Sequence, residues 1–228
     1  MDHIAIASPR LRRRALLAAV VVPLLPAGPR EPCCGLISAN GDRLARFLDT
    51  SGVETHWIAG WHVNWRTGLP DRAAPGGPAS DSHCSAFVAA IADRLGLPLL
   101  HPPEHRQTLL ANAQAQWLAG PGAALGWRAL GWRQAQAAAN EGALVLAVFA
   151  NPDPRRPGHI AIVRPSLKDA AALERDGPQV IQAGEKNYRS IDLRTGFSHH
   201  PGAWRPGGGG AVRFYAHPLD WTPPPMAG

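Results

Sequence analysis

One cysteine and one histidine have the residue types and surroundings of a thiol nucleophile and its base. Cys84 lies at the expected first turn of a helix, where peptide dipoles favour a thiolate, so we expect a lowered thiol pKa. His159 follows Gly158 at the start of an expected strand, near a sheet edge, where its ring can accept the thiol proton. A thiolate attacks carbonyl carbon, and the Cys84 N–H can stabilise the resulting oxyanion. The two residues therefore indicate acyl-transfer or hydrolytic chemistry.

A third polar side chain is expected to orient the imidazole. In the segment 159–163 the two isoleucines share one face, and His159 lies on the other. In the segment 179–183 the single isoleucine belongs with them, which puts Gln182 on the face of His159. In an antiparallel hairpin Gln182 then lies level with His159 to within about one residue and accepts the ring N–H. Asn187, shortly after this strand, is the alternative third residue.

The elements that must position these residues follow from apolar periodicity and turn residues. Apolar residues at helical spacing predict a helix that is capped by Asp81 or Ser82 and ended by Gly96. Helices followed by mostly adjacent strands indicate an α+β fold, with N-terminal helices packed on one side of an antiparallel sheet. The other expected helices span 42–50, 106–118 and 124–140, and the expected strands span 143–150, 159–163, 179–183, 190–193 and 211–215.

The N-terminal segment has the composition of a secretory signal peptide. Four arginines between positions 10 and 14 precede the apolar run 15–25, which is too short to span a bilayer. We therefore expect an exported chain, periplasmic or extracellular, without stable membrane insertion after processing. The expected organisation is a signal peptide over 1–28, a linker over 29–40, one domain over 41–221 and a tail over 222–228.

Charge and histidine spacing exclude two classes of partner. The formal charge of the 228 residues is +6, and the signal peptide carries about half of it. The mature chain then lacks the concentrated basic face that nucleic-acid binding requires. His101 and His105 flank two prolines and cannot share a helix face as a zinc pair, and His199 and His200 lie in an expected loop. We expect no metal and no organic cofactor.

The cysteine pattern leaves one thiol unpaired. Cys33 and Cys34 are adjacent, and their Cα separation of about 3.8 Å is below the usual disulfide span of ~4.4–6.8 Å. A bridge between them is therefore disfavoured, and the pair is interpreted as a remnant near the processing site. Cys84 is then expected to have no disulfide partner. An unpaired thiol in an exported protein calls for a function.

Three short blocks resemble the NlpC/P60 cysteine peptidases. The block 81–88 (DSHCSAFV) resembles the family's nucleophile block, and 158–163 (GHIAIV) resembles its histidine block. The block 180–184 (VIQAG) resembles the one that carries the third polar residue. The resemblance covers roughly residues 61–217. The family's upstream tyrosine-containing segment has its nearest match at 64–68 (NWRTG), which lacks tyrosine and puts the substrate specificity in question.

This resemblance implies a fold and an activity. NlpC/P60 peptidases and the related CHAP amidases share a papain-like fold and cleave amide bonds in bacterial peptidoglycan. The resemblance assigns Cys84 as nucleophile, His159 as base and Gln182 as orienting residue. We expect an endopeptidase or amidase that acts as a monomer on peptidoglycan stem peptides. Two alternatives stay open: a non-catalytic cell-wall-binding module, which would tolerate loss of Cys84, and a papain-like acyltransferase, which would pass the thioester to an amine.

Overall fold

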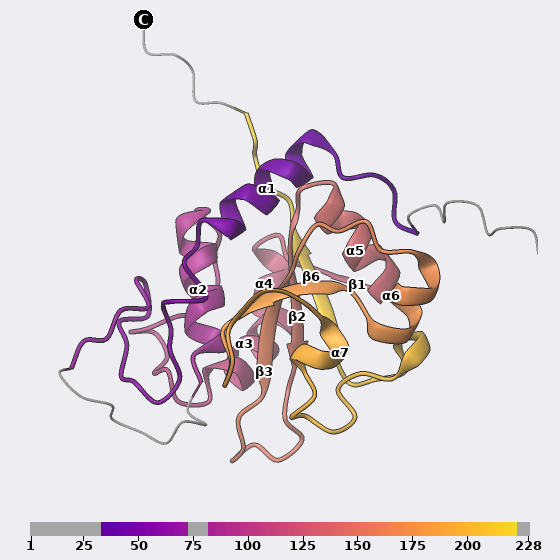
Figure 1. The fold of residues 1–228 in the computed structure, drawn as a ribbon. Helices are drawn as coiled ribbons and strands as arrows, with labels where there is room; N and C mark the ends of the chain where they lie inside the picture. Colours follow the sequence, from indigo (N-terminus) through magenta and orange to yellow (C-terminus); the bar gives the residue numbers. More distant parts are fainter. Residues whose placement is uncertain (1–32, 73–81, 223–228) are drawn as a thin grey trace, which may run out of the picture. The chain divides into compact units, whose positions relative to one another are not determined.

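Six antiparallel strands form one sheet in the computed structural model, which describes residues 33–72 and 82–222 (Figure 1). The expected signal peptide and all but the first residue of the expected tail lie outside these residues. The strands are β1 (Arg128–Leu130), β2 (Leu144–Phe149), β3 (His159–Val163), β4 (Gln179–Gln182), β5 (Tyr188–Asp192) and β6 (Arg213–His217). Their spatial order is β1-β6-β2-β3-β4-β5. Each of the five expected strands is confirmed, and β1 is an additional edge strand.

Helices precede the sheet and are also inserted between its strands. The described residues contain α1 (Ala39–Asp49), α2 (Cys84–Arg94), α3 (Leu110–Ala119), α4 (Pro121–Ala124), α5 (Trp132–Asn140), α6 (Ala170–Asp176), α7 (Leu193–Gly196) and a short 3-10 helix, η1 (Pro206–Gly208). The chain is thus a mixed α/β protein with an antiparallel six-stranded sheet. The α1 helix starts within the expected linker, because the Ser38 hydroxyl accepts a hydrogen bond from Gly41 N at 3.1 Å and caps the helix.

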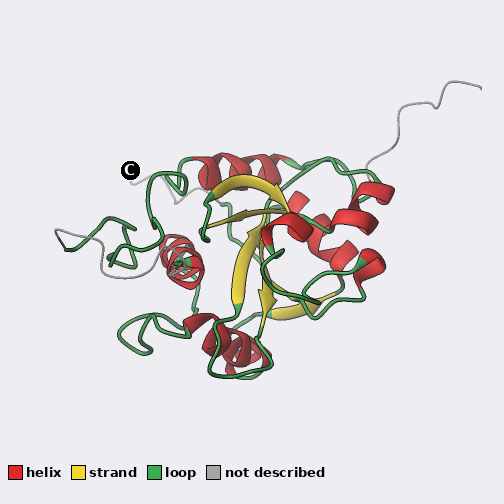
Figure 2. Ribbon diagram, turned by 60° about the horizontal axis from the view of Figure 1, so that its bottom comes forward, coloured by secondary structure: helices red, strands yellow, loops and turns green. Residues whose placement is uncertain are grey.

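Helices cover both faces of the sheet, whereas the sequence predicted helices on one side. We call first face the side of Leu144, Leu146, Val148, Ile160 and Ile162, which pack with residues of α1, α2 and α3. The second face is that of Val145, Ala147, Phe149, Ala161 and Val163, which pack with residues of α5 and α7. Figures 1 and 2 show the strands between the two groups of helices. Because β2 and β3 are buried and apolar on both sides, both sides must be covered.

The expected helix over 124–140 is wrong in its first half. The chain leaves α4 through Gly126, whose φ of +97° is in the left-handed region that favours glycine. A Cβ at Gly126 would also lie 2.7 Å from His217 Nε2, so the turn packs closely against β6. The following residues form β1, which pairs antiparallel with β6 before α5 begins. Pairing with a strand some 85 residues later thus overrides the local helical pattern.

Candidate functional site

The start of α2 holds Cys84 against the first face of the sheet. Cys84 is the first helical residue, and His83 takes the N-cap position that the sequence assigned to Asp81 or Ser82. On α3, the side-chain amide of Gln114 donates to Ser85 O at 3.2 Å and to Leu100 O at 3.0 Å. The first bond ties the first turn of α2 to α3, and the second ties the loop after α2 to the same helix. The thiol therefore occupies a fixed position at the end of a buried helix.

Burial dominates the electrostatics of the Cys84 thiol. The residue is 5% exposed, and burial raises its pKa above the ordinary value of 9.0. Hydrogen bonds from the main chain of Ile160, of Ser85 and of Cys84 itself oppose this rise, as does the Ser82 side chain. The expected lowering of the thiol pKa is thus wrong, because desolvation outweighs the helix start and the donors around the sulfur. The thiol is protonated near neutral pH and needs a base to become a nucleophile.

Cys84 lines a cleft of about 650 Å³. This volume is within the usual range for small-molecule sites, about 300–1,000 Å³. The walls come from the start of α2, the loop that precedes it, the start of α3 and the connection before β3. The lining residues that matter for the chemistry are Trp61, His62, Arg72, Ser82, Arg106 and Arg155. The free thiol therefore lies beside a cavity that can hold part of a substrate.

His159 and Gln182 form a buried polar pair, as the alternation of the two strands predicted. His159 Nε2–H donates to Gln182 Oε1 at 3.0 Å, which leaves Nδ1 as the acceptor of a neutral ring. Ile162 pairs with Ile181, so Gln182 lies on the face of His159 but two residues from level with it, whereas the sequence predicted an offset of about one residue at most. Burial lowers the pKa of His159 below 6.5, although the bond to Gln182 raises it.

This pair lies on the second face, whereas Cys84 lies on the first. The His159 ring packs edge-on against Phe197, with centroids 4.6 Å apart, and stacks on His200 at 5.4 Å. Phe197 belongs to the apolar cluster of the second face, and Cys84 to that of the first. The thiol contacts the main chain of Ile160, the next residue along β3. Across the two described stretches, no hydrogen bond joins Cys84 to His159. The structure thus brings His159 to Gln182 and separates both from the thiol.

Asn187, the alternative third residue, has another role in the fold. Its amide donates to Val53 O at 2.7 Å and to His56 O at 2.8 Å, and its Oδ1 accepts from Gly184 N at 3.0 Å. The side chain thereby ties the turn between β4 and β5 to the loop that follows α1. No bond to His159 is among the contacts of Asn187 in the described chain.

Other histidines distinguish the two faces further. Next to His159, burial lowers the pKa of His200 to about 4. On the opposite side of the sheet, His62 in the cleft is paired with the Asp71 carboxylate through Nδ1, an arrangement that the sequence analysis missed. The segment around His62 has neither helical nor alternating periodicity, so its spacing alone held no signal for this pair. Within the described residues, no three metal-binding side chains converge on one point.

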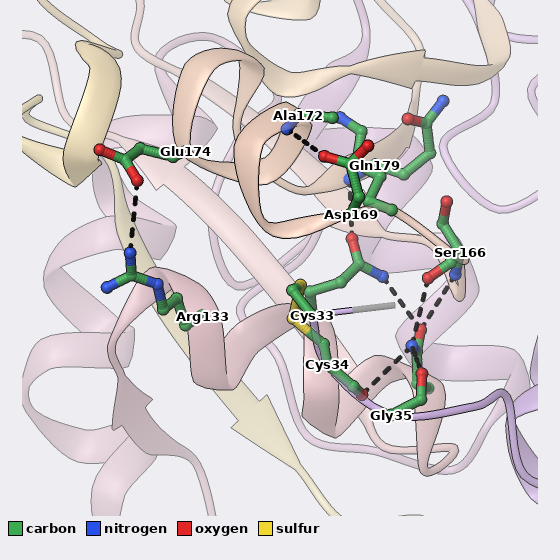
Figure 3. Close-up of a disulfide and its surroundings, with 12 residues drawn as sticks. Cys33, Cys34, Gly35, Arg133, Ser166, Asp169, Ala172, Glu174 and Gln179 are labelled. Atoms are coloured by element: carbon green, nitrogen blue, oxygen red, sulfur yellow. Dashed lines mark hydrogen bonds and ion pairs between the residues drawn. A yellow bond between two sulfur atoms is a disulfide. The ribbon is translucent and has the colours of Figure 1, made fainter. Parts of the chain in front are cut away.

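Cys33 and Cys34 form a disulfide, which corrects the expectation that the pair is unbridged (Figure 3). Their Cα atoms are 3.8 Å apart, the separation that the peptide bond imposes, and rotation of the side chains brings the sulfurs together. The pair is also part of the fold, because Cys33 N donates to Lys168 O at 3.1 Å. Cys84 has a free thiol, as predicted.

Comparisons with known proteins add no family to this geometry. The sequence matches no family model and no curated protein. Of the helices in residues 33–72 and 82–222, none has the length and apolar character needed to cross a membrane. The thiol, the cleft and the resemblance of the three sequence blocks are therefore the features that bear on function.

Proposed function

We propose that the protein is an exported cysteine hydrolase, an endopeptidase or amidase that cleaves amide bonds in peptidoglycan stem peptides. The observation that carries this proposal is the free Cys84 thiol at the start of α2, in the wall of a cleft of about 650 Å³. The resemblance to NlpC/P60 peptidases supports the same nucleophile and the same class of substrate. A papain-like fold, an extracytoplasmic location and a monomeric state belong to this proposal.

The chemistry is acyl transfer through a thioester. The Cys84 sulfur attacks the carbonyl carbon of the amide, and its proton passes to a histidine. The N–H groups of Cys84 and Ser85, which contact the sulfur, lie close to where the oxyanion develops. The histidine then protonates the amine as the C–N bond breaks, and water releases the acyl group as a carboxylate. The sequence assigns the proton transfer to His159, which would require its ring to reach the first face.

The charge of the cleft favours an anionic substrate. Three arginines line it, namely Arg72, Arg106 and Arg155, and none of its described lining residues is acidic. Arg155 is paired with Asp153 at 3.2 Å, so its charge is partly compensated. Stem peptides carry free carboxylates, which arginine side chains bind well. The cleft therefore complements this class of substrate in sign of charge.

Mass spectrometry of peptidoglycan after incubation with the purified protein tests this function. Hydrolysis yields fragments that are heavier by one water in total than the intact stem peptide, and Cys84→Ser should yield none. An acyltransferase would instead give products in which an added amine is joined to the new carbonyl. A binding module would sediment with the peptidoglycan and leave its masses unchanged, and Cys84→Ser would bind equally well. Either of these results would contradict the hydrolase.

A further inference from the structure

The loop before α2 brings a histidine and a carboxylate together. Val63 and Pro70 form an isolated antiparallel bridge, and Asn64 N donates to Leu69 O at 2.9 Å. Beyond the bridge, Asp71 N donates to His62 O at 3.1 Å. This hairpin-like path sets the two side chains at its open end side by side, and the Asp71 carboxylate accepts from His62 Nδ1–H. The pairing is thus supported by the main chain on both sides of the loop.

Two contacts fasten this loop to the start of α2. His83 Nε2–H donates to Trp61 O at 2.8 Å, so the residue before Cys84 is bonded to the residue before His62. Deeper in the loop, the fully buried Trp57 packs edge-on against Phe87 of α2, with centroids 5.1 Å apart. His62 and Cys84 line the same cleft. The loop that carries His62 is therefore fastened to the start of α2 by the bond from the His83 side chain to the Trp61 main chain and by a core contact, and both Cys84 and His62 face one cavity.

We propose that His62, oriented by Asp71, is the base that takes the proton of Cys84. The proposal rests on the proposed function and names a residue for one of its steps. Because Nδ1–H is donated to Asp71, the neutral ring presents the lone pair of Nε2. Nε2 takes the thiol proton as the S–C bond forms and returns it to the amine as the C–N bond breaks. The Asp71 carboxylate stabilises the imidazolium between these two steps.

Two other histidines are less suited to this step. His83 is adjacent to the thiol, but its Nε2–H is bonded to Trp61 O. His159 lies on the second face, bonded to Gln182 and packed against Phe197. The side chains of His62 and Asp71 are 45% and 40% exposed, so substrate and solvent protons can reach them. The charged side chains that line the cleft with His62 are Arg72, Arg106 and Arg155, and Arg155 is paired with Asp153.

Alkylation of Cys84 by iodoacetamide tests this assignment without a known substrate. The rate is measured against pH on the folded, unreduced protein, and mass spectrometry locates the label. A base in the cleft takes the thiol proton and then carries a positive charge, which stabilises the thiolate. Loss of the base should therefore raise the pH midpoint of labelling. We expect His62→Ala to raise the midpoint by about one unit or more and to slow labelling at pH 6.5 by about tenfold. Asp71→Asn should give a smaller shift in the same direction, and Asp71→Glu should restore the wild-type profile.

His199→Ala is the matched control, because His199 is also an exposed histidine paired with a carboxylate. It lies 3.4 Å from Glu185, and neither residue lines the cleft of Cys84. We expect the wild-type profile for this control. His62→Gln serves as a second variant if His62→Ala lowers the melting temperature.

Other labelling results would overturn either the assignment of His62 or the proposed hydrolase. An unchanged profile in His62→Ala and His62→Gln would overturn the assignment. A raised midpoint in His159→Gln, without one in His62→Ala, would overturn it in favour of His159. If wild-type protein releases no peptidoglycan fragment although labelling still depends on His62, the hydrolase proposal fails and the thiol–imidazole pair stands. The two proposals are thus separable in one set of variants.

Discussion

The two faces of the sheet hold their polar groups under different conditions. On the first face, the Cys84 thiol lines a cleft together with His62, whose partner Asp71 is partly exposed. On the second face, His159 and Gln182 are 5% and 4% exposed, satisfy each other and do not line that cleft. A partly exposed pair at a cleft can exchange protons with a substrate bound there, whereas a buried and satisfied pair contributes to the packing of the sheet. Cys84 and His159 thus have the expected order in the sequence but lie on opposite faces of the sheet. The cause is the alternation along β3, in which the thiol contacts Ile160 and the neighbouring His159 points to the other side.

The largest expected effect is the loss of activity when the thiol of the first face is removed. Cys84→Ser should lower hydrolysis of peptidoglycan by at least about a thousandfold, because the nucleophile forms the covalent intermediate. The double variant Cys33→Ser/Cys34→Ser is the control and should keep wild-type turnover. Mass spectrometry of the peptidoglycan fragments released by the wild type and by each variant measures this effect. Full activity of Cys84→Ser would show that the thiol of the first face is not the nucleophile.

On the second face the largest expected effect is on stability. His159→Ala removes a buried ring next to Phe197 and leaves Gln182 Oε1 without its donor. We expect a loss of about 3 kcal/mol in the free energy of unfolding, measured in urea. A variant that keeps the wild-type free energy of unfolding but loses hydrolysis would instead place the His159 ring at the thiol.

Asn187→Ala should destabilise the connection between the β4–β5 turn and the loop after α1 by about 3 kcal/mol. The variant leaves the carbonyls of Val53 and His56 and the N–H of Gly184 without their partner, and each unsatisfied buried group costs about 1 kcal/mol or more. Urea unfolding measures the loss, and hydrogen exchange at residues 53–57 shows where it acts. Faster exchange confined to β3 would contradict this role and would connect Asn187 to His159.

The second face should lose folding stability at acid pH, and the first face should lose it at alkaline pH. Burial lowers the pKa of His159, and that of His200 to about 4, so the unfolded chain binds protons first as the pH falls. Stability from the second face is therefore complete above pH 6.5 and declines between 6.5 and about 4. Burial raises the pKa of Cys84 above 9.0, so the unfolded chain loses this proton first and stability declines above that pH.

Melting temperatures across this range separate the two contributions. We expect changes of a few degrees at each end, about 3 °C for each kcal/mol in a domain of this size. Cys84→Ala should lose the alkaline decline and keep the acid one, and His200→Asn should reduce the acid decline. An alkaline decline of wild-type size in Cys84→Ala would show that another group causes it.

Reduction of the Cys33–Cys34 disulfide should have the smallest effect. A bridge between adjacent residues closes a very short loop, so it constrains the unfolded chain little. We expect the melting temperature to change by less than about 2 °C and activity to be retained or raised. A loss of several degrees would show that the bridge holds the segment before α1 in place.

Local alternation made part of the site predictable. The isoleucines of 159–163 and 179–183 indicated that His159 and Gln182 share a face, and the structure confirms their hydrogen bond. Apolar spacing with a following glycine likewise placed Cys84 at a helix start, which is confirmed. These inferences concern residues within one helix or one pair of neighbouring strands, where the geometry of the backbone sets the relation between side chains.

The sequence by itself determined five of the six strands, the helix start at Cys84 and the shared face of His159 and Gln182. Tertiary structure alone decided which face α2 covers, and this separates Cys84 from His159. Both faces of β3 are buried and carry apolar residues, so alternation along the strand does not indicate which face packs against a helix some 70 residues earlier. The raised pKa of the thiol and the pairing of His62 with Asp71 were likewise decided by packing. Burial and loop closure depend on contacts between distant segments, which no local pattern encodes.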